Sequence, residues 1–310
     1  MTGIDRRAFV AGSAIALAGC ATGVGSSACP AAGTCAGEWH VFSKMFQPPV
    51  TKSPEELCAL MRGAGFDGIQ WTVRPKGHVE PSAARTELPR LCRIAESFGL
   101  RNRTICTDLK PGDANAEEVL KVAADCGIVH QRPAYFFYDA KRESFRQSLD
   151  RFRRGFAWFA DLAERTGVRM AYQNHSSWGP SVFGGVIWDI HECIRDLDPR
   201  LVGVEYDPMH AFFETSLSWS HGLELIAPWI AAVDLKDFHY RPDPKDARKV
   251  RKAMVPAGEG IVPWGEAHRL LAANGVKVPY IVHFEHKFDT ADLPATVKRE
   301  IGVFRRVFTD

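Results

Sequence analysis

Residues 168–175 read VRMAYQNH, a short apolar run that ends in polar Gln173, Asn174 and His175. Three later segments repeat this design, with Asp207-Pro-Met-His210 after Leu201–Tyr206, Asp234-Leu-Lys236-Asp237 after Ile230–Val233, and Glu285-His286 after Tyr280–Phe284. Short runs rich in Val, Ile, Tyr and Phe suit buried parallel strands. Because a parallel barrel brings the carboxyl ends of its strands to one face, the polar groups predict a common site as well as a fold.

Strand and helix signals alternate along the rest of the chain. Eight such pairs predict an α/β fold, the (β/α)₈ TIM barrel. Gly stands where several helices should stop, as in Thr166-Gly-Val168 and Asn274-Gly-Val276. A doubly wound open sheet is the alternative, but it normally carries a Gly-rich phosphate loop after its first strand, and none occurs there. The expected strands are Trp39–Phe46, Gly68–Arg74, Arg103–Asp108, Val129–Phe136, Val168–His175, Leu201–Asp207, Ile230–Lys236 and Tyr280–Glu285, and helices are expected to begin near Pro54, Ala84, Ala116, Glu143, Ile187, Ser220, Pro263 and Leu293.

The composition is that of an ordinary globular protein of 310 residues, with 45% hydrophobic and 25% charged residues. Lys+Arg 39 against Asp+Glu 37 give a net charge of +2, which argues against the basic surface of a nucleic-acid-binding protein. We therefore expect no nucleic-acid partner and a single barrel domain over residues 38–310. Two longer loops, Arg74–Arg85 and the highly charged Tyr240–Gly260, follow strand ends and are candidates to cover the site, or are solvated excursions.

The first 20 residues have the features of an export signal. Asp5-Arg6-Arg7-Ala8-Phe9 is a twin-arginine pattern, and an apolar run too short for a permanent membrane helix leads to a lipoprotein-like box ending in Cys20. We expect export to the periplasm or cell envelope, with lipidated Cys20 as a membrane anchor and residues 21–37 as a flexible tether. An untargeted amphipathic tail is the alternative, and Cys29 and Cys35 are either paired or two separate thiols.

The strand-end residues suit the binding of a cation. Asp207 and Glu285 are carboxylates at the ends of buried strands, where a lone charge is costly unless it is paired or coordinated. Asp234 adds a third carboxylate and Gln173 an amide oxygen, so the set is hard and rich in oxygen. Further candidates to contact a substrate are a set of polar, cationic and aromatic residues near other strands: His40, Lys44, Gln70, Arg132, His175 and Trp178.

These motifs resemble, in order and spacing, those of the sugar phosphate isomerase/epimerase family, which has a xylose-isomerase-like barrel. The resemblance covers about Trp39 to Arg306. It implies one divalent metal, often Mn²⁺, Mg²⁺, Co²⁺ or Zn²⁺, held by Glu, Asp, His and Glu on four successive strands. It also implies that the two glutamates move protons beside a carbonyl that the metal polarises. The segments that carry it are Gln173-Asn174-His175, Asp207-Pro-Met-His210, Val233-Asp-Leu-Lys-Asp237, Gly258-Glu-Gly260 and Phe284-Glu285.

Two positions depart from the family pattern. Gln173 stands at the first glutamate and Asp234 at the histidine. Because Gln173 cannot titrate, it cannot be a general base, which puts the two-glutamate relay in doubt. In one interpretation the metal persists in a set of Gln173, Asp207, Asp234 and Glu285 that favours Mg²⁺, Mn²⁺ or Ca²⁺. In the other the metal is lost, and a carbohydrate site built on hydrogen bonds remains.

The resemblance predicts an isomerase or epimerase that moves a proton at a carbon next to a carbonyl of a free or oxidised sugar or glycoside. Glu285 is the expected base, His210, Lys236 or His175 are its proton partners, and His210 positions a substrate hydroxyl. Two alternatives are a non-catalytic carbohydrate-binding lipoprotein, which Gln173 favours, and a metal-dependent lyase or hydrolase acting on oxidised glycosides. The oligomeric state is left open.

Overall fold

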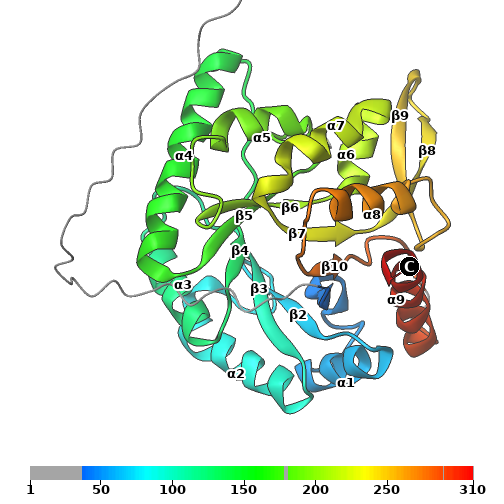
Figure 1. The fold of residues 1–310 in the computed structure, drawn as a ribbon. Coiled ribbons are helices and arrows are strands. Elements are labelled where there is room, and N and C mark those ends of the chain that lie inside the picture. The colour runs from blue at the N-terminus through cyan, green and yellow to red at the C-terminus, as the bar shows by residue number, and fades with distance from the viewer. Residues whose placement is uncertain (1–36, 178–180, 289, 310) are drawn as a thin grey trace, which may run out of the picture. The chain divides into compact units, whose positions relative to one another are not determined.

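Eight parallel strands close into a barrel in the order β1-β10-β7-β6-β5-β4-β3-β2 (Figure 1). The structure, a computed structural model, describes residues 37–177, 181–288 and 290–309. The closed parallel sheet confirms the predicted TIM barrel. The strands are β1 Trp39–Phe42, β2 Gly68–Val73, β3 Arg101–Thr107, β4 His130–Arg132, β5 Arg169–Gln173, β6 Val202–Tyr206, β7 Ile230–Leu235 and β10 Tyr280–Val282.

Helices follow the strands and surround the barrel (Figure 1). Local sequence sets their ends: the Ser53 side chain accepts from the Glu56 amide at the start of α1, and Ser144 and Gln147 form a reciprocal capping box on α4. Gly65 and Gly167 end these two helices with positive φ, a conformation that glycine adopts without steric cost. The helices are α1 Pro54–Ala64, α2 Ala84–Ser97, α3 Ala116–Asp125, α4 Phe145–Thr166, α5 Ile187–Ile194, α6 Pro208–Thr215, α7 Trp219–Ile226, α8 Trp264–Ala273 and α9 Leu293–Thr309.

The apolar core lies largely between the strands and the helices. Phe152 and Phe156 on α4 are buried against Tyr172 of β5 and Phe183, with the Phe152 and Phe183 ring centroids 4.5 Å apart. Burying each such ring contributes roughly 2 kcal/mol to folding. Polar side chains of the strands, in contrast, contact one another across the barrel interior: Gln70 of β2, for example, donates to Glu205 of β6 over 2.9 Å. This polar interior is where the candidate site is built.

Two local expectations need correction. The first strand ends at Phe42 rather than Phe46, because Ser43–Phe46 form a 3₁₀ helix, η1. Asp207 is followed directly by a helix: its side chain accepts from the His210 amide and so caps α6, which starts at Pro208, a favourable first helical residue. The short α6 was not expected, since its apolar residues lie too close to those of the preceding strand to give a separate period.

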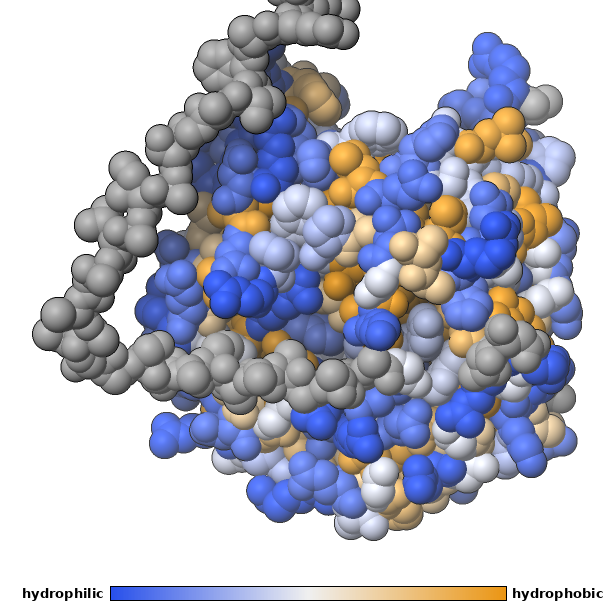
Figure 2. Space-filling view, in the orientation of Figure 1, coloured by the Kyte–Doolittle hydropathy of each residue, from blue (hydrophilic) through white to orange (hydrophobic). Residues whose placement is uncertain are grey.

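The segment expected as a charged loop is a β-hairpin of β8 Asp237–Asp243 and β9 Asp246–Val255. Its tip is covered mainly by hydrophilic side chains (upper right in Figure 2), among them the exposed ion pair of Arg251 and Asp243. The two strands of this hairpin carry mainly charged and polar residues, so they lack the apolar periodicity that predicts a strand. The hairpin returns the chain to the barrel mouth, where Lys252 of β9 reaches the site described below.

Buried Asp237 fixes the base of this hairpin. Its carboxylate accepts from the amides of Gly258, Gly260 and Val262 and from the indole N–H of Trp264, at 3.2–3.3 Å. A Cβ atom on Gly260 would lie 1.9 Å from Asp237 Oδ1, so the close approach of this carboxylate requires glycine.

Within the described ranges, none of the helices combines the length and the apolar character needed to span a bilayer.

Candidate active site

Three of the predicted strand-end residues meet through one ammonium group. Lys236, directly after β7, places Nζ 3.1 Å from Asp207 Oδ2 and 3.2 Å from Glu285 Oε2. Asp207 follows β6, and Glu285 lies three residues beyond β10. Since β6, β7 and β10 are neighbours in the barrel, the chain brings together groups that are up to 78 residues apart (285 − 207). The predicted convergence of Asp207 and Glu285 on one rim is therefore present.

Gln173 joins this group through its amide nitrogen. Its Nε2 donates to Asp234 Oδ2 over 2.5 Å and to Asp207 Oδ2 over 3.3 Å, while Oε1 accepts from Arg132 over 2.9 Å and from the Tyr135 hydroxyl. The assignment of O and N follows from the partners: turning the amide over would set oxygen against two carboxylates and nitrogen against two donors. Gln173 thus bridges the acidic and the cationic sides of the barrel.

Glu285 is the acidic residue of this group that reaches solvent. Its side chain is 25% exposed, whereas those of Asp207 and Lys236 are 0% and 1% exposed. Burial raises the pKa of Glu285, but the charge of Lys236, then His283 and Lys44, outweigh burial and hold this pKa well below its usual value. A substrate that enters the barrel mouth therefore meets an ionised carboxylate backed by a buried ammonium.

Two further acidic residues, Glu205 and Asp234, are fully buried in the barrel interior. Burial raises the pKa of Glu205 to about 8, and the charge of Asp234 adds to this rise; burial and Asp207 raise the pKa of Asp234 to about 8 as well. Arg132 lies 3.3 Å from Glu205, and His283 Nε2 lies 3.3 Å from Asp234. Burial therefore opposes the charged form of both acids, while the charge of Arg132 favours it in each.

The residues do not fit the four-ligand metal set that the resemblance implies. Gln173 presents N–H groups, which cannot ligate a metal, to Asp207 and Asp234. The Lys236 ammonium already lies between Asp207 and Glu285, so a dication beside them would meet a fixed positive charge. A deeper group of Glu205, Asp234 and His283 offers donor atoms within 4.8 Å of one another and is a possible carboxylate and histidine site for an ion.

His210 is held in one tautomer by a chain of donors. Lys252 from β9 donates to Ser176 Oγ, which frees the Ser176 hydroxyl hydrogen to donate to His210 Nδ1 over 2.8 Å. Because Lys can only donate, this order assigns the ring proton to Nε2. Burial, with the charge of Lys236, lowers the pKa of His210 well below its usual value, so the ring is neutral. No acceptor in the described part of the chain forms a hydrogen bond with Nε2, and Asp207 Oδ2 lies 3.6 Å away.

The other residues predicted to contact a substrate lie at different depths in the barrel. Lys44 follows β1 on η1 and is exposed at the mouth, and His175 packs on His210 with ring centroids 3.7 Å apart. Gln70 and Arg132 are buried behind Glu205 and Gln173 and support those residues rather than face the opening. His40 bonds Glu38 over 3.0 Å beside Gly68, the first residue of β2, so it lies at the opposite end of the barrel. Trp178 lies outside the described residues.

Several site residues were missed in the sequence. His283 lies 3.3 Å from both Glu285 Oε1 and Asp234 Oδ1. Its position two residues before Glu285 is a signal, because alternate strand residues share a face. Tyr135, Ser176 and Lys252 carry no comparable signal: they follow β4, follow β5 or lie on the hairpin, and only the fold aims them inward.

The buried Arg132 gives a stability test of the polar interior. Arg132→Met removes the donor to Gln173, the partner of Glu205 and a cation–π contact with Phe42 at 4.6 Å. We expect the free energy of unfolding to fall by about 3 kcal/mol, measured by urea denaturation. Arg90→Met, which breaks an exposed pair with Glu87, is the control and should change it by less than about 1 kcal/mol. Equal effects of the two substitutions would contradict a structural role for the interior network.

The barrel and this rim define an enzyme-like α/β-barrel site in which a partly exposed, ionised carboxylate lies against a buried ammonium, with a buried neutral imidazole nearby. The chain belongs to the xylose isomerase-like TIM barrel family, whose sequence profile matches residues 58–307. A search of curated proteins found no match.

Solved structures with the same fold include three sugar-related proteins. The D-allulose 3-epimerase from Methylomonas sp. has a TM-score of 0.66 at 11% identity, over 87% of this chain and 97% of the other. The 3-keto-D-glucoside 4-epimerase from E. coli has a TM-score of 0.65 at 15% identity, over 87% and 99%. A xylose isomerase domain protein from Planctomyces limnophilus has a TM-score of 0.61 at 12% identity, over 89% and 100%. At these identities the likeness establishes the fold alone.

Proposed function

We propose that this protein is a sugar isomerase or epimerase that moves a proton at a carbon next to a carbonyl. The observation that carries the proposal is the Glu285–Lys236 pair: a carboxylate 25% exposed to solvent whose ammonium partner, 3.2 Å away, is buried. A base for carbon acids needs both a group that accepts the proton and a positive charge near the oxygen that becomes negative. The family membership supports this reaction class.

In the proposed step, Glu285 accepts the proton from the carbon beside the carbonyl. The electrons of the broken C–H bond form a carbon–carbon double bond, and the carbonyl electrons move to oxygen, which gives an enediolate. The low pKa of Glu285 keeps it ionised but makes it a weak base. Stabilisation of the enediolate oxygen must therefore supply much of the rate, and Lys236 is the buried cation positioned to provide it.

The proton then returns to carbon. If Glu285 returns it to the neighbouring carbon on the same face, and the hydroxyl proton of that carbon passes to the original carbonyl oxygen, the product is an isomer in which the carbonyl has moved. If water instead gives a proton to the opposite face of the original carbon, and Glu285 loses its proton to solvent, the product is an epimer. His210, with Nε2–H directed away from Ser176, is proposed to hold a substrate hydroxyl rather than to donate this proton, because its pKa is well below neutral.

The resemblance implies metal assistance, but the donor set favours a reaction without it. Gln173 turns its amide nitrogen to Asp234, and the Lys236 ammonium lies 3.1 Å from Asp207, as described above. We therefore propose that Lys236 performs the electrostatic role at the carbonyl oxygen. As substrate we propose a free or oxidised sugar or a glycoside; structural neighbours named as a D-allulose 3-epimerase and a 3-keto-D-glucoside 4-epimerase support this class.

Hydrogen exchange distinguishes this reaction from the alternatives. Purified protein is incubated in deuterated water with D-fructose, D-allulose or a 3-keto-glucoside, and NMR follows deuterium at the carbons beside the carbonyl. We expect deuterium incorporation together with an isomeric product. Cleavage without isomer formation would indicate a lyase or hydrolase. Saturable binding without exchange would indicate a carbohydrate-binding protein and would contradict the proposal.

The Lys252–Ser176–His210 chain predicts an alkaline limit to activity. Burial, with the charge of Lys236, lowers the pKa of Lys252 to about 8. Below this pH the ammonium donates to Ser176; above it the neutral amine is able to accept from Ser176, and Nε2 of His210 no longer retains its proton. We expect kcat to fall above about pH 8. Lys252→Met should lower kcat and abolish its fall at alkaline pH. Lys245→Met, at an exposed lysine of the hairpin tip, should leave that fall in place.

Export and anchoring are a separate proposal. Residues 5–20 lie outside the described residues, and the twin-arginine pattern and the Cys20 box support secretion followed by lipidation. We expect replacement of Arg6 and Arg7 by Lys to retain the protein in the cytoplasm, and Cys20→Ala to release it from the membrane fraction. Unchanged fractionation of both variants would contradict the proposal.

A further inference from the structure

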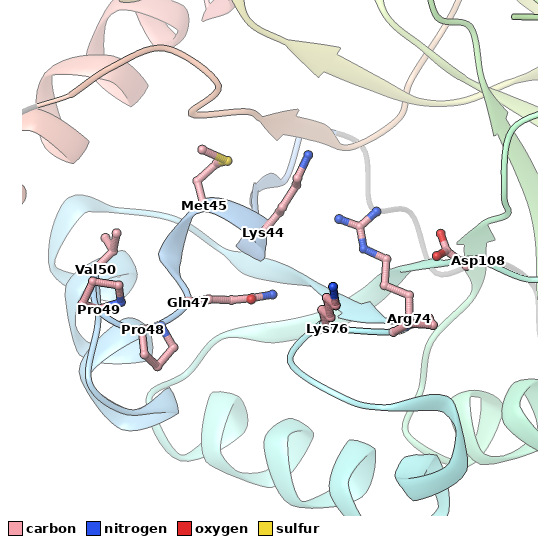
Figure 3. Close-up of a pocket in the computed structure, with 10 residues that line it drawn as sticks. Lys44, Met45, Gln47, Pro48, Pro49, Val50, Arg74, Lys76 and Asp108 are labelled. Atoms are coloured by element: carbon pink, nitrogen blue, oxygen red, sulfur yellow. The ribbon is translucent and has the colours of Figure 1, made fainter. Parts of the chain in front are cut away.

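A cavity of about 460 Å³ opens beside the proposed catalytic pair, at the carboxyl ends of β1, β2 and β3. Lys44 on η1, Arg74 directly after β2, Lys76 in the following loop and Asp108 directly after β3 line it, together with Met45 and Gln47 (Figure 3). In this view the Arg74 guanidinium lies between the Lys44 amine and the Asp108 carboxylate. Since β10 neighbours β1, the cavity is on the same side of the barrel mouth as Glu285.

The cavity has an excess of positive charge. Three of its lining residues are cationic and one, Asp108, is anionic. Among the ion pairs of the described residues, none involves Lys44, Arg74 or Lys76. Cations that share a cavity repel one another, and the one carboxylate, Asp108, does not balance three cations, so an entering anion is stabilised.

The loop that carries two of these cations is tightly held. The Arg74 amide donates to Val79 O over 2.9 Å, and the Gly77 amide donates to Arg74 O over 2.8 Å. His78 Nδ1 bonds Thr72 Oγ1 at 3.0 Å and Ser43 Oγ at 3.2 Å, which ties the loop to the start of η1. The backbone that carries Arg74 and Lys76 is therefore held in place by these bonds, which limits where the two cations can reach.

Lys76 has an uncommon backbone conformation. Its φ is 60°, in the left-handed region that a non-glycine residue rarely adopts. The Lys76 amide donates to Glu80 Oε1 over 2.7 Å, so a specific contact maintains this geometry. A strained residue retained at the rim of a cavity is a typical mark of a binding site. Lys76 is one of the residues that line the cavity (Figure 3).

Lys44 links the cavity to the catalytic pair. Partial burial lowers its pKa; the charge of Glu285 raises this pKa, while Arg74, Arg132 and Lys236 lower it. Lys44 is thus within electrostatic range of Arg74 on one side and of Glu285 on the other. One bound molecule could therefore place an anionic group against Arg74 and Lys76 while another of its carbons approaches Glu285.

We infer that this cavity binds the anionic group, a carboxylate or a phosphate, of a sugar whose reacting carbonyl lies at Glu285. The inference rests on the proposed function for the place of the carbonyl, but the anion site itself stands on Lys44, Arg74 and Lys76. Guanidinium and ammonium groups bind both anions, so the shared chemistry is that of an acidic sugar. A sugar acid and a sugar phosphate are separated by experiment.

The test measures binding in the Glu285→Gln variant, so that turnover does not interfere. Calorimetry compares D-glucose with D-glucuronate and with D-glucose 6-phosphate, and D-fructose with D-fructose 6-phosphate, at low and at high salt. We expect at least one acidic sugar to bind ten-fold or more tightly than its neutral counterpart, and the ratio to fall as salt rises. Preference for glucuronate identifies a carboxylate site, and preference for the phosphates identifies a phosphate site.

Arg74→Gln and Lys76→Met should each lower the acidic-to-neutral affinity ratio by three-fold or more. Lys110→Met removes an exposed lysine that follows β3 outside the cavity and should leave the ratio unchanged. Thermal unfolding verifies that the variants are folded. A ratio near one in the Glu285→Gln protein with an intact cavity, no binding of any acidic sugar, or a ratio preserved in both cavity variants would overturn the inference. Failure of hydrogen exchange with a preserved charge preference would instead remove the proposed reaction and leave the anion site.

Discussion

Glu285→Gln is expected to reduce deuterium exchange at the substrate carbon by roughly 10³-fold, the effect of losing a positioned general base. The amide keeps the shape of the carboxylate but cannot accept the proton. Because Lys236 retains Asp207 as a partner at 3.1 Å, the variant should remain folded. NMR exchange rates, with circular dichroism and thermal unfolding on the same samples, measure both expectations.

The matched control is Glu266→Gln on α8. Glu266 has a similar intermediate exposure, but it lies in the first turn of a helix rather than in the acid cluster. Its exchange rate should equal that of the unchanged protein. Retention of a tenth or more of the activity in folded Glu285→Gln would exclude Glu285 as the base.

Lys236→Met is expected to lower both stability and activity, because it leaves the Asp207 and Glu285 carboxylates without their shared cation. Lys236 is 1% exposed and is 3.1 Å from Asp207 and 3.2 Å from Glu285. Removing one partner of a buried ion pair destabilises a protein by about 3–5 kcal/mol, so urea denaturation should detect the loss. Exchange activity should also fall, since the enediolate oxygen would lose its nearby positive charge.

The same variant tests the role of a divalent metal. If the ammonium takes the place of a dication, the carboxylates released in Lys236→Met should bind Mn²⁺ more tightly than the parent protein does. Added Mn²⁺ should therefore restore more stability to the variant than to the parent. Lys287→Met, an exposed lysine shortly after β10, is the control. Stoichiometric, tightly bound metal in the purified parent protein, with no gain in the variant, would favour the metal set implied by the resemblance.

The barrel could be predicted because its signals are local. A barrel strand is covered by helices and flanked by neighbouring strands on both edges, so its sequence is a short apolar run. Helix ends carry their own capping residues, such as Ser53 and Gly65 on α1. The start of α2 at Ala84, of α3 at Ala116 and of α5 at Ile187 agrees with the expectation. The hairpin β8–β9 was missed because its partners are charged and its pairing is set by the turn rather than by burial.

Side-chain depth in the barrel was harder to predict. His40 and Lys44 were both expected on the first strand and as substrate contacts, but the early start of η1 separates them: His40 is buried at the amino end with Glu38, and Lys44 is exposed at the mouth. A strand of four residues offers little sequence to reveal where it ends. The consequence is chemical, since only one of the two can meet a substrate.

By itself the sequence determined the alternating strands and helices, the gathering of Asp207 and Glu285 at one rim, and the two departures at Gln173 and Asp234. Only the tertiary structure decided what those departures mean: which end of the Gln173 amide faces the acids, and that Lys236 lies between Asp207 and Glu285. The physical reason is the distance along the chain over which each interaction acts. Strand and cap preferences act over a few residues, whereas hydrogen-bond direction and charge balance depend on groups that only the closed barrel brings within 4 Å.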